Sequence, residues 1–137
     1  MANTETTIQD CLQSCRTIAV VGLSPKTHRD SYRVAQYMQA HGYRIIPINP
    51  TVTEVLGEQA YANLTDAAAH SPIDMVNCFR NSEDIPPIAE EAIAVGAKAL
   101  WLQRGISHPQ AQARAQAAGL WVVSDHCLMV EHRKLFS

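Results

Sequence analysis

The stretch TIAVVGLSPKTHRDS, residues 17–31, is the part of the chain that decides its fold. Residues 17–22 form an unbroken apolar and β-branched run, which is typical of a parallel strand buried on both faces. A basic loop follows, and we expect Asp30 or Ser31 to cap the helix that comes next. That helix keeps apolar residues at helical spacing until Gly42 ends it. The stretch therefore predicts the strand, loop and helix that begin a βαβ unit.

The rest of the chain repeats this alternation of strand and helix. Apolar runs predict four further strands, at residues 43–48, 73–79, 98–103 and 120–124. Because Pro47 has no N–H to donate, the first of these strands should end early or have an unpaired edge there. The pattern predicts an α/β fold, a three-layer, Rossmann-like, doubly wound and mostly parallel sheet of five to six strands with helices on both faces.

The helix boundaries come from proline, glycine and capping signals. Pro86 and Pro87 open one predicted helix, which Gly96 closes. Ser107 and Gln110 form a candidate capping box for an alanine-rich helix that ends at Gly119. Residues 51–71 carry a weaker pattern, which predicts at most a short strand near residues 60–62 and then a helix in DAAAH.

Length and composition limit the classes of protein to consider. The 137 residues are enough for one core, so we expect one domain, residues 1–137. A net charge of −2 lacks the basic excess of a dedicated nucleic-acid binder. The first ten residues have no basic or apolar leader, and no stretch reaches the roughly 20 apolar residues of a membrane span. We therefore expect a cytoplasmic protein that binds neither nucleic acid nor membrane.

The four cysteines, Cys11, Cys15, Cys78 and Cys127, lack paired motif spacing. Reduced thiols are therefore favoured over disulfides, and no metal site is predicted. Cys11 and Cys15 share a helical face with Ile8 and Leu12, which favours core packing over thiol chemistry or metal binding.

A parallel sheet of this kind binds ligands where its strands end, so the residues after each strand are the candidate site. A dinucleotide fingerprint needs three glycines after the first strand, and here Gly22 stands alone. An NAD site also needs a carboxylate after the second strand, where this chain has Asn49 and Pro50. The phosphate-binding motif of P-loop NTPases is absent as well. The sequence thus supports neither an NAD site nor a P-loop.

Four cationic or titratable side chains, Lys26, His28, Arg29 and Arg33, surround the predicted helix start. They favour a ligand with more than one phosphate, and the alternative is a solvated basic loop. Phe79 and Arg80 end a predicted strand and could flank a base, the alternative being a core ring and a surface charge. Together these features describe a phosphorylated adenine nucleotide bound without the NAD carboxylate.

Six motifs carry a resemblance to a known family: VVGLSPKTHRDSY, GYRIIPINP, LGEQAYANL, FRNSEDI, LWLQRGI and DHCL. Over residues 11–131 they resemble the small stand-alone CoA-binding-domain proteins, whose fold is similar to the N-terminal CoA-binding domain of the succinyl-CoA synthetase α-subunit and of NDP-forming acyl-CoA synthetases. The resemblance implies that coenzyme A binds across the carboxyl ends of the strands. The binding residues that it implies are Gly22, Leu23, Ser24, Lys26, His28, Arg29, Asp30, Ser31, Asn49, Pro50, Phe79, Arg80, Asn81, Ile85, Gln103 and Gly105.

The expected function is non-catalytic binding of CoA or an acyl-CoA, as a carrier, sensor or regulatory module, with or without a protein partner. The related synthetases add domains, one with a phosphorylated histidine, that we do not expect here, and no catalytic residue is predicted. The alternative is a small CoA-dependent transferase or thiol–disulfide enzyme that uses Cys127. Asp125 is expected to cap a last helix, residues 125–132, with Cys127 either packed or a functional thiol.

Overall fold

The structure is a computed structural model, and it describes residues 4–136 of the chain; residues 1–3 and 137 of the predicted domain lie outside the described part. Five strands form the main sheet: β1 (Thr17–Val21), β2 (Arg44–Ile48), β5 (Met75–Cys78), β6 (Ala99–Leu102) and β7 (Trp121–Val123). The helices are α1 (Thr4–Ser14), α2 (Asp30–Ala40), α3 (Leu64–Ala68), α4 (Ile85–Ala94), α5 (Pro109–Ala117) and α6 (Leu128–Phe136), with a short 3₁₀ turn η1 (Ser82–Asp84) before α4.

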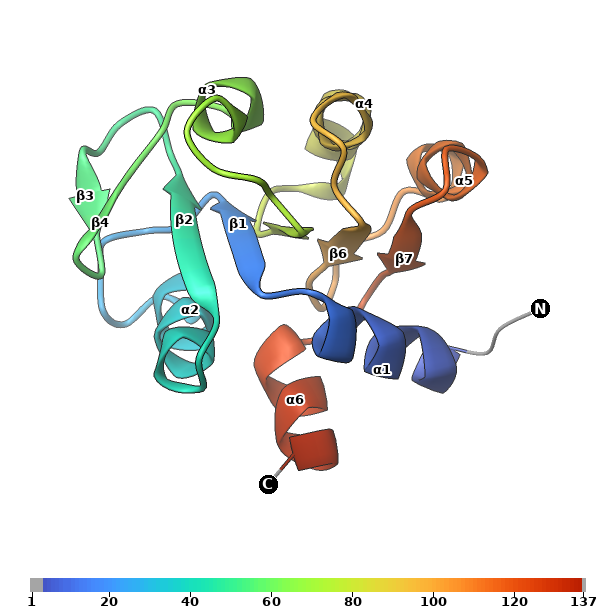
Figure 1. Ribbon diagram of the computed structural model, residues 1–137, viewed down its shortest axis with the longest axis horizontal. Helices are drawn as coiled ribbons and strands as arrows, with labels where there is room; N and C mark the ends of the chain where they lie inside the picture. Colours follow the sequence, from blue (N-terminus) through green and yellow to red (C-terminus); the bar gives the residue numbers. More distant parts are fainter. Residues whose placement is uncertain (1–3, 137) are drawn as a thin grey trace.

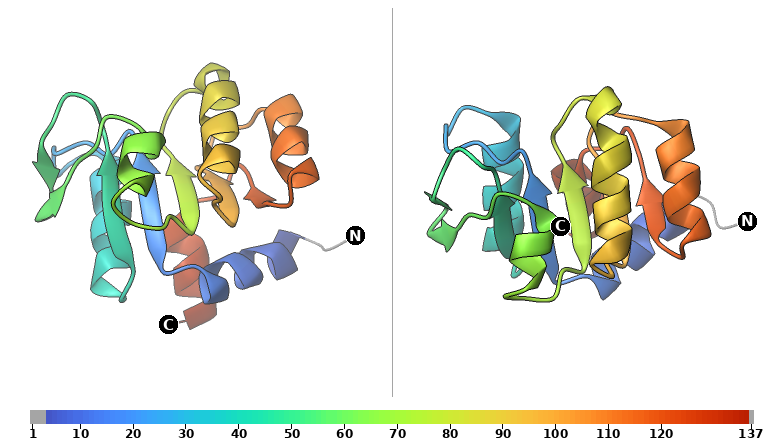
Figure 2. Two further views of the ribbon diagram at one scale, coloured as in Figure 1. Left: turned by 45° about the horizontal axis from the view of Figure 1, so that its top comes forward. Right: turned by 90° about the horizontal axis from the view of Figure 1, so that it is seen from above.

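The sheet is parallel throughout, in the order β2-β1-β5-β6-β7. Figure 1 shows α3, α4 and α5 on one face of this sheet and α1, α2 and α6 on the other. The two turned views in Figure 2 show the same three layers. The predicted Rossmann-like, doubly wound α/β fold is confirmed. The strand order reverses between β1 and β5, so the switch point of the sheet lies at their carboxyl ends.

Alternate residues of each strand fill two cores, one on either side of the sheet. In β1, Ile18 and Val20 pack toward α1, α2 and α6, while Ala19 and Val21 pack toward α3, α4 and α5. Burial on both sides explains why the strands appear in the sequence as continuous apolar runs. No helix among residues 4–136 is long and apolar enough to cross a membrane.

Cys11, Cys15 and Cys78 are completely buried in these cores. Burial raises the pKa of each of the three thiols to about 12. The predicted core packing of Cys11 and Cys15 is confirmed. Their thiols are therefore neutral at physiological pH and poorly reactive.

Three predicted helix caps are wrong, because the predicted side chains bind other groups or lie next to the residue at the cap position. Arg29 precedes α2, and no side chain caps that helix. His108 caps α5 through Nδ1, which accepts a hydrogen bond from the Ala111 N–H at 3.1 Å. Asp125 has a φ of 59° and accepts from the Gly105 N–H, and α6 begins three residues later.

In residues 51–71, where the sequence pattern is weak, the chain forms a small antiparallel hairpin of β3 (Glu54–Val55) and β4 (Glu58–Gln59) beside β2. The strand predicted near residues 60–62 is reduced to one bridge between Tyr61 and Ile48. As Pro47 requires, β2 is an edge strand; the Pro47 carbonyl accepts a hydrogen bond from the Tyr61 N–H at 3.0 Å.

The Asp74 side chain connects the N-terminal ends of three neighbouring strands, β1, β5 and β6. Its carboxylate accepts hydrogen bonds from the N–H groups of Arg16 (2.9 Å) and Thr17 (3.1 Å), and it lies 3.6 Å from the Lys98 ammonium. Burial alone raises the pKa of Asp74, but these hydrogen bonds and Lys98 outweigh it, so the pKa lies below its ordinary value. The charged carboxylate therefore stabilises the folded chain.

We predict that Asp74→Asn lowers the free energy of unfolding at pH 7 by about 1–3 kcal/mol, because a carboxylate that accepts two N–H groups is lost. The pKa is lowered on folding, so this stabilisation is present above pH ~4 and is lost as the pH falls through the folded-state pKa. Denaturant unfolding as a function of pH should show a flatter acid limb in the variant. Glu54→Gln is the control, because Glu54 is exposed and its carboxylate has no partner within residues 4–136. Equal acid limbs in all three proteins would contradict this role.

Candidate functional site

Three adjoining hollows lie at the carboxyl ends of β1, β2, β5 and β6. The loop hollow, about 590 Å³, is bounded by the segment between β1 and α2. The α4 hollow, about 780 Å³, lies between the ends of β1, β2 and β5 and the start of α4. The α6 hollow, about 420 Å³, lies between α2, the end of β6 and the start of α6. Phe79 lines all three, so they meet at the switch point between β1 and β5.

The structure brings all but three of the predicted binding residues to these hollows. Those lining at least one hollow are Gly22, Ser24, Lys26, His28, Arg29, Asp30, Ser31, Asn49, Pro50, Phe79, Arg80, Asn81 and Gln103. Leu23 and Ile85 have fully buried side chains in the core, and Gly105 lies outside the three hollows.

Gly22 lets the end of β1 approach the end of β5. Its φ is +86°, and a Cβ there would lie 3.1 Å from the Phe79 carbonyl oxygen and 3.2 Å from Arg80 Cδ. The Gly22 N–H donates to the Ile48 carbonyl at 2.9 Å, which holds the same residue against β2. The single glycine of the loop is thus required by packing between strand ends.

The two serines of the loop are used to hold its shape. Ser31 Oγ accepts a hydrogen bond from the Ser24 N–H at 3.0 Å, and Ser24 Oγ accepts from the Lys26 N–H at 3.1 Å. Asn49 joins this loop to the next one: its Nδ2 donates to the Leu23 carbonyl at 2.9 Å, and its Oδ1 accepts from Thr51 N–H and Oγ1. These short polar side chains fix the loops that line the hollows.

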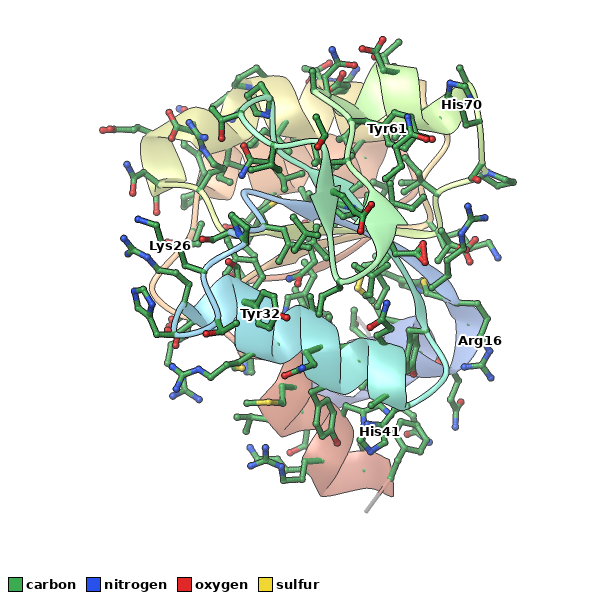
Figure 3. All side chains as sticks on the ribbon, turned by 90° about the vertical axis from the view of Figure 1, so that its left-hand side faces the viewer. Arg16, Lys26, Tyr32, His41, Tyr61 and His70 are labelled. Atoms are coloured by element: carbon green, nitrogen blue, oxygen red, sulfur yellow. The ribbon has the colours of Figure 1, made fainter. Side chains whose placement is uncertain are left out.

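The longer basic side chains of the loop form no ion pairs in the part of the chain that the structure describes. Lys26, His28 and Arg29 are exposed, and none of them forms an ion pair within residues 4–136. Figure 3 shows Lys26 on the loop that leads into α2, at the edge of the molecule. By contrast, Arg33 pairs with Asp30.

The N-terminus of α2 opens into the same hollow. This helix is 11 residues long and has no side-chain cap, so its first N–H groups and its dipole are available to an anion. Unpaired cations beside an uncapped helix N-terminus form an arrangement that binds phosphate groups.

The chain matches the model of a CoA-binding domain over residues 16–133. The chain belongs to this CoA-binding-domain family. It is 42% identical to YneT of Bacillus subtilis over 125 residues, which are 91% of each chain. It is 35% identical to a protein of known structure from Pyrococcus horikoshii, with a TM-score of 0.92 and coverage of 99% of this chain and 94% of that one.

An acetyl-coenzyme A synthetase of Candidatus Korarchaeum cryptofilum shares the fold. The match has 20% identity and a TM-score of 0.70, and it covers 80% of this chain but only 26% of the synthetase. The predicted membership of the CoA-binding-domain family, with a fold that recurs in such synthetases, is confirmed.

Sequence reasoning missed several residues that line the site of this family member. Thr51, Asn63 and Glu91 line the α4 hollow. The first two lie in the segment without a clear strand or helix pattern, so no sequence signal placed them at the sheet edge. Among residues 4–136, no group of three or more His, Cys, Asp or Glu side chains could hold a metal ion.

We predict that Gly22→Ala destabilises the fold by about 1 kcal/mol more than Gly96→Ala. Both glycines have positive φ, but a Cβ at Gly96 would meet nothing within 4 Å, whereas one at Gly22 would press on Phe79 and Arg80. The difference between the two variants therefore isolates the contact at the switch point. Denaturant unfolding measures both, and an equal loss of stability would show that the contact is unimportant.

Proposed function

We propose that residues 1–137 form one domain that binds coenzyme A or an acyl-CoA at the carboxyl ends of the strands, as a carrier, sensor or regulatory module. The observation that carries this proposal is the loop hollow, where three cationic or titratable side chains, which form no ion pairs among residues 4–136, surround a helix N-terminus without a side-chain cap. CoA has a pyrophosphate and a ribose 3′-phosphate, so it supplies several anionic groups to such a hollow. Membership of the CoA-binding-domain family supports the same ligand.

The hollows on either side suit the two ends of the molecule. In the α4 hollow, Phe79 and Arg80 offer flat groups that can stack on the adenine. The lining of the α6 hollow includes Val34, Met129 and Val130, which suits the less polar pantetheine arm. CoA therefore crosses the switch point with its phosphates in the loop hollow.

The polar groups of the crevice support a binding role. Ser24, Ser31 and Asn49 already hold the loops through hydrogen bonds, and the side chains left for the ligand in the loop hollow are mainly cations. Such a set neutralises phosphate charge and orients the ligand.

We predict that calorimetric titration detects CoA binding that is weakened when the 3′-phosphate is removed, as in dephospho-CoA, and much weaker binding of NAD. The double variant Lys26→Gln, Arg29→Gln should lower CoA affinity about tenfold or more, since charge-assisted hydrogen bonds to phosphate are lost. Arg44→Gln is the control, because Arg44 is an exposed cation at the opposite end of the sheet.

Binding of NAD without binding of CoA would overturn the proposal. Equal affinities for CoA and dephospho-CoA would show that the 3′-phosphate is not held by the loop. Native mass spectrometry of the purified protein then identifies which CoA or acyl-CoA it carries.

A further inference from the structure

The α6 hollow contains two groups that phosphate and base binding do not use: the amide of Gln103 and the thiol of Cys127. The hollow adjoins the loop hollow, since Asp30 and Phe79 line both. A ligand whose phosphates occupy the loop hollow can therefore extend into the α6 hollow without crossing the core.

Gln103 presents an unpartnered donor to this hollow. The residue is only 5% exposed. Its Oε1 accepts hydrogen bonds from Asn77 Nδ2 and from the Leu128 N–H, both at 3.0 Å. The Leu128 N–H can only donate, so it fixes which end of the amide is the oxygen. Nε2 is left without a partner among residues 4–136 and belongs to a side chain that lines the hollow. Because this nitrogen is not among the fully buried polar atoms that lack a partner, it is accessible from the hollow and can donate a hydrogen bond to a carbonyl group of a ligand there.

Cys127 differs from the other three cysteines of the chain. Cys11, Cys15 and Cys78 are buried in the two cores, whereas Cys127 is partly exposed and lines the α6 hollow. It immediately precedes Leu128, whose N–H is bound to Gln103, so the thiol and the free amide donor lie on the same wall. A ligand held by that donor therefore passes close to the Cys127 sulfur.

We propose that the α6 hollow takes the pantetheine arm of CoA, with an amide carbonyl of that arm bound by Gln103 Nε2, and that Cys127 forms a reversible mixed disulfide with the CoA thiol. This inference rests on the CoA binding proposed above. It adds a covalent and redox-dependent step at a named residue.

The step is a thiol–disulfide exchange with CoA disulfide as the oxidised reactant. The Cys127 thiolate attacks the sulfur of the CoA half that is seated in the crevice, and the S–S bond of CoA disulfide breaks. The other half leaves as CoA thiolate and takes up the proton that Cys127 lost. One disulfide and one thiol are present before and after the step. A reducing thiol reverses it and releases CoA, so the oxidation state of the CoA pool controls how firmly the protein holds its ligand.

The test compares two disulfides on the reduced protein at pH 8, where an ordinary cysteine is partly ionised. CoA disulfide should add one CoA moiety to the chain, seen by intact mass, mapped to Cys127 by peptide analysis and removed by dithiothreitol. Because the crevice holds the reactant beside the thiol, we expect this reaction to be about tenfold or more faster than with glutathione disulfide at the same concentration. An S-alkyl CoA, which has no free thiol, should slow it by occupying the crevice.

Gln103→Glu tests the positioning residue. The substitution keeps an oxygen for Asn77 and Leu128 but removes the donor, so the rate ratio between CoA disulfide and glutathione disulfide should fall. A merely structural role for Gln103 would leave this ratio unchanged. Cys127→Ser should lose the adduct while retaining its circular dichroism spectrum.

Equal rates for the two disulfides, or an adduct on another cysteine, would overturn the inference. Titration of reduced CoA into the wild-type protein under reducing conditions is the separate test of the proposed function. If reduced CoA binds but Cys127 is not selectively labelled, only the proposed mixed disulfide is contradicted. If reduced CoA does not bind, the proposed CoA site itself is contradicted.

Discussion

The whole crevice depends on the close approach of the ends of β1 and β5 at Gly22. From this point the chain leaves β1 toward α2 on one face of the sheet and leaves β5 toward α4 on the other. Such divergence opens a crevice in any doubly wound sheet. Here a side chain at residue 22 would collide with the Phe79 carbonyl and with Arg80. The absence of a Cβ therefore keeps the two strand ends together, and the three hollows meet at Phe79 because of it.

Around this crevice, the short polar side chains stabilise the loops, whereas the long basic side chains are available to a ligand. Ser24, Ser31 and Asn49 are consumed by hydrogen bonds between loops, which hold the chain in one shape before a ligand arrives. Lys26, His28 and Arg29 make no ion pairs within the described chain and project from that fixed loop. Loops ordered in advance reduce the entropy lost on binding, so a larger share of the phosphate interaction is available as affinity.

The sequence predicted the strands, which have a local apolar pattern, but it did not predict features that depend on contacts between residues far apart in the chain. All five strands of the main sheet were predictable, because strands buried on both faces are long apolar runs. The β3–β4 hairpin was not, since two-residue strands carry no periodicity. Asp is a common N-cap residue, but the Asp125 carboxylate accepts a hydrogen bond from the Gly105 N–H, 20 residues earlier, instead of from the start of a helix. The cations of the loop were recognised from their position after a strand, whereas the α6 hollow requires contacts among α2, β6 and α6 that only the folded chain provides.

Asn77 and Gln103 are polar side chains buried in an otherwise apolar part of the sheet. The hydrogen bond between their amides suggests a reason for their presence there. Asn77 Oδ1 is buried without a hydrogen-bond partner among the described residues, which costs about 1–3 kcal/mol. An apolar residue there would avoid that cost, as elsewhere in β5. Asn77 Nδ2 and the Leu128 N–H both donate to Gln103 Oε1, so together they fix which end of this amide is the oxygen and leave Nε2 as the free donor of a side chain that lines the α6 hollow. The unpartnered Asn77 oxygen therefore destabilises the sheet, but the same side chain helps to orient a donor at the ligand crevice. A buried polar group with an unfavourable free energy is expected where a structure serves a binding site.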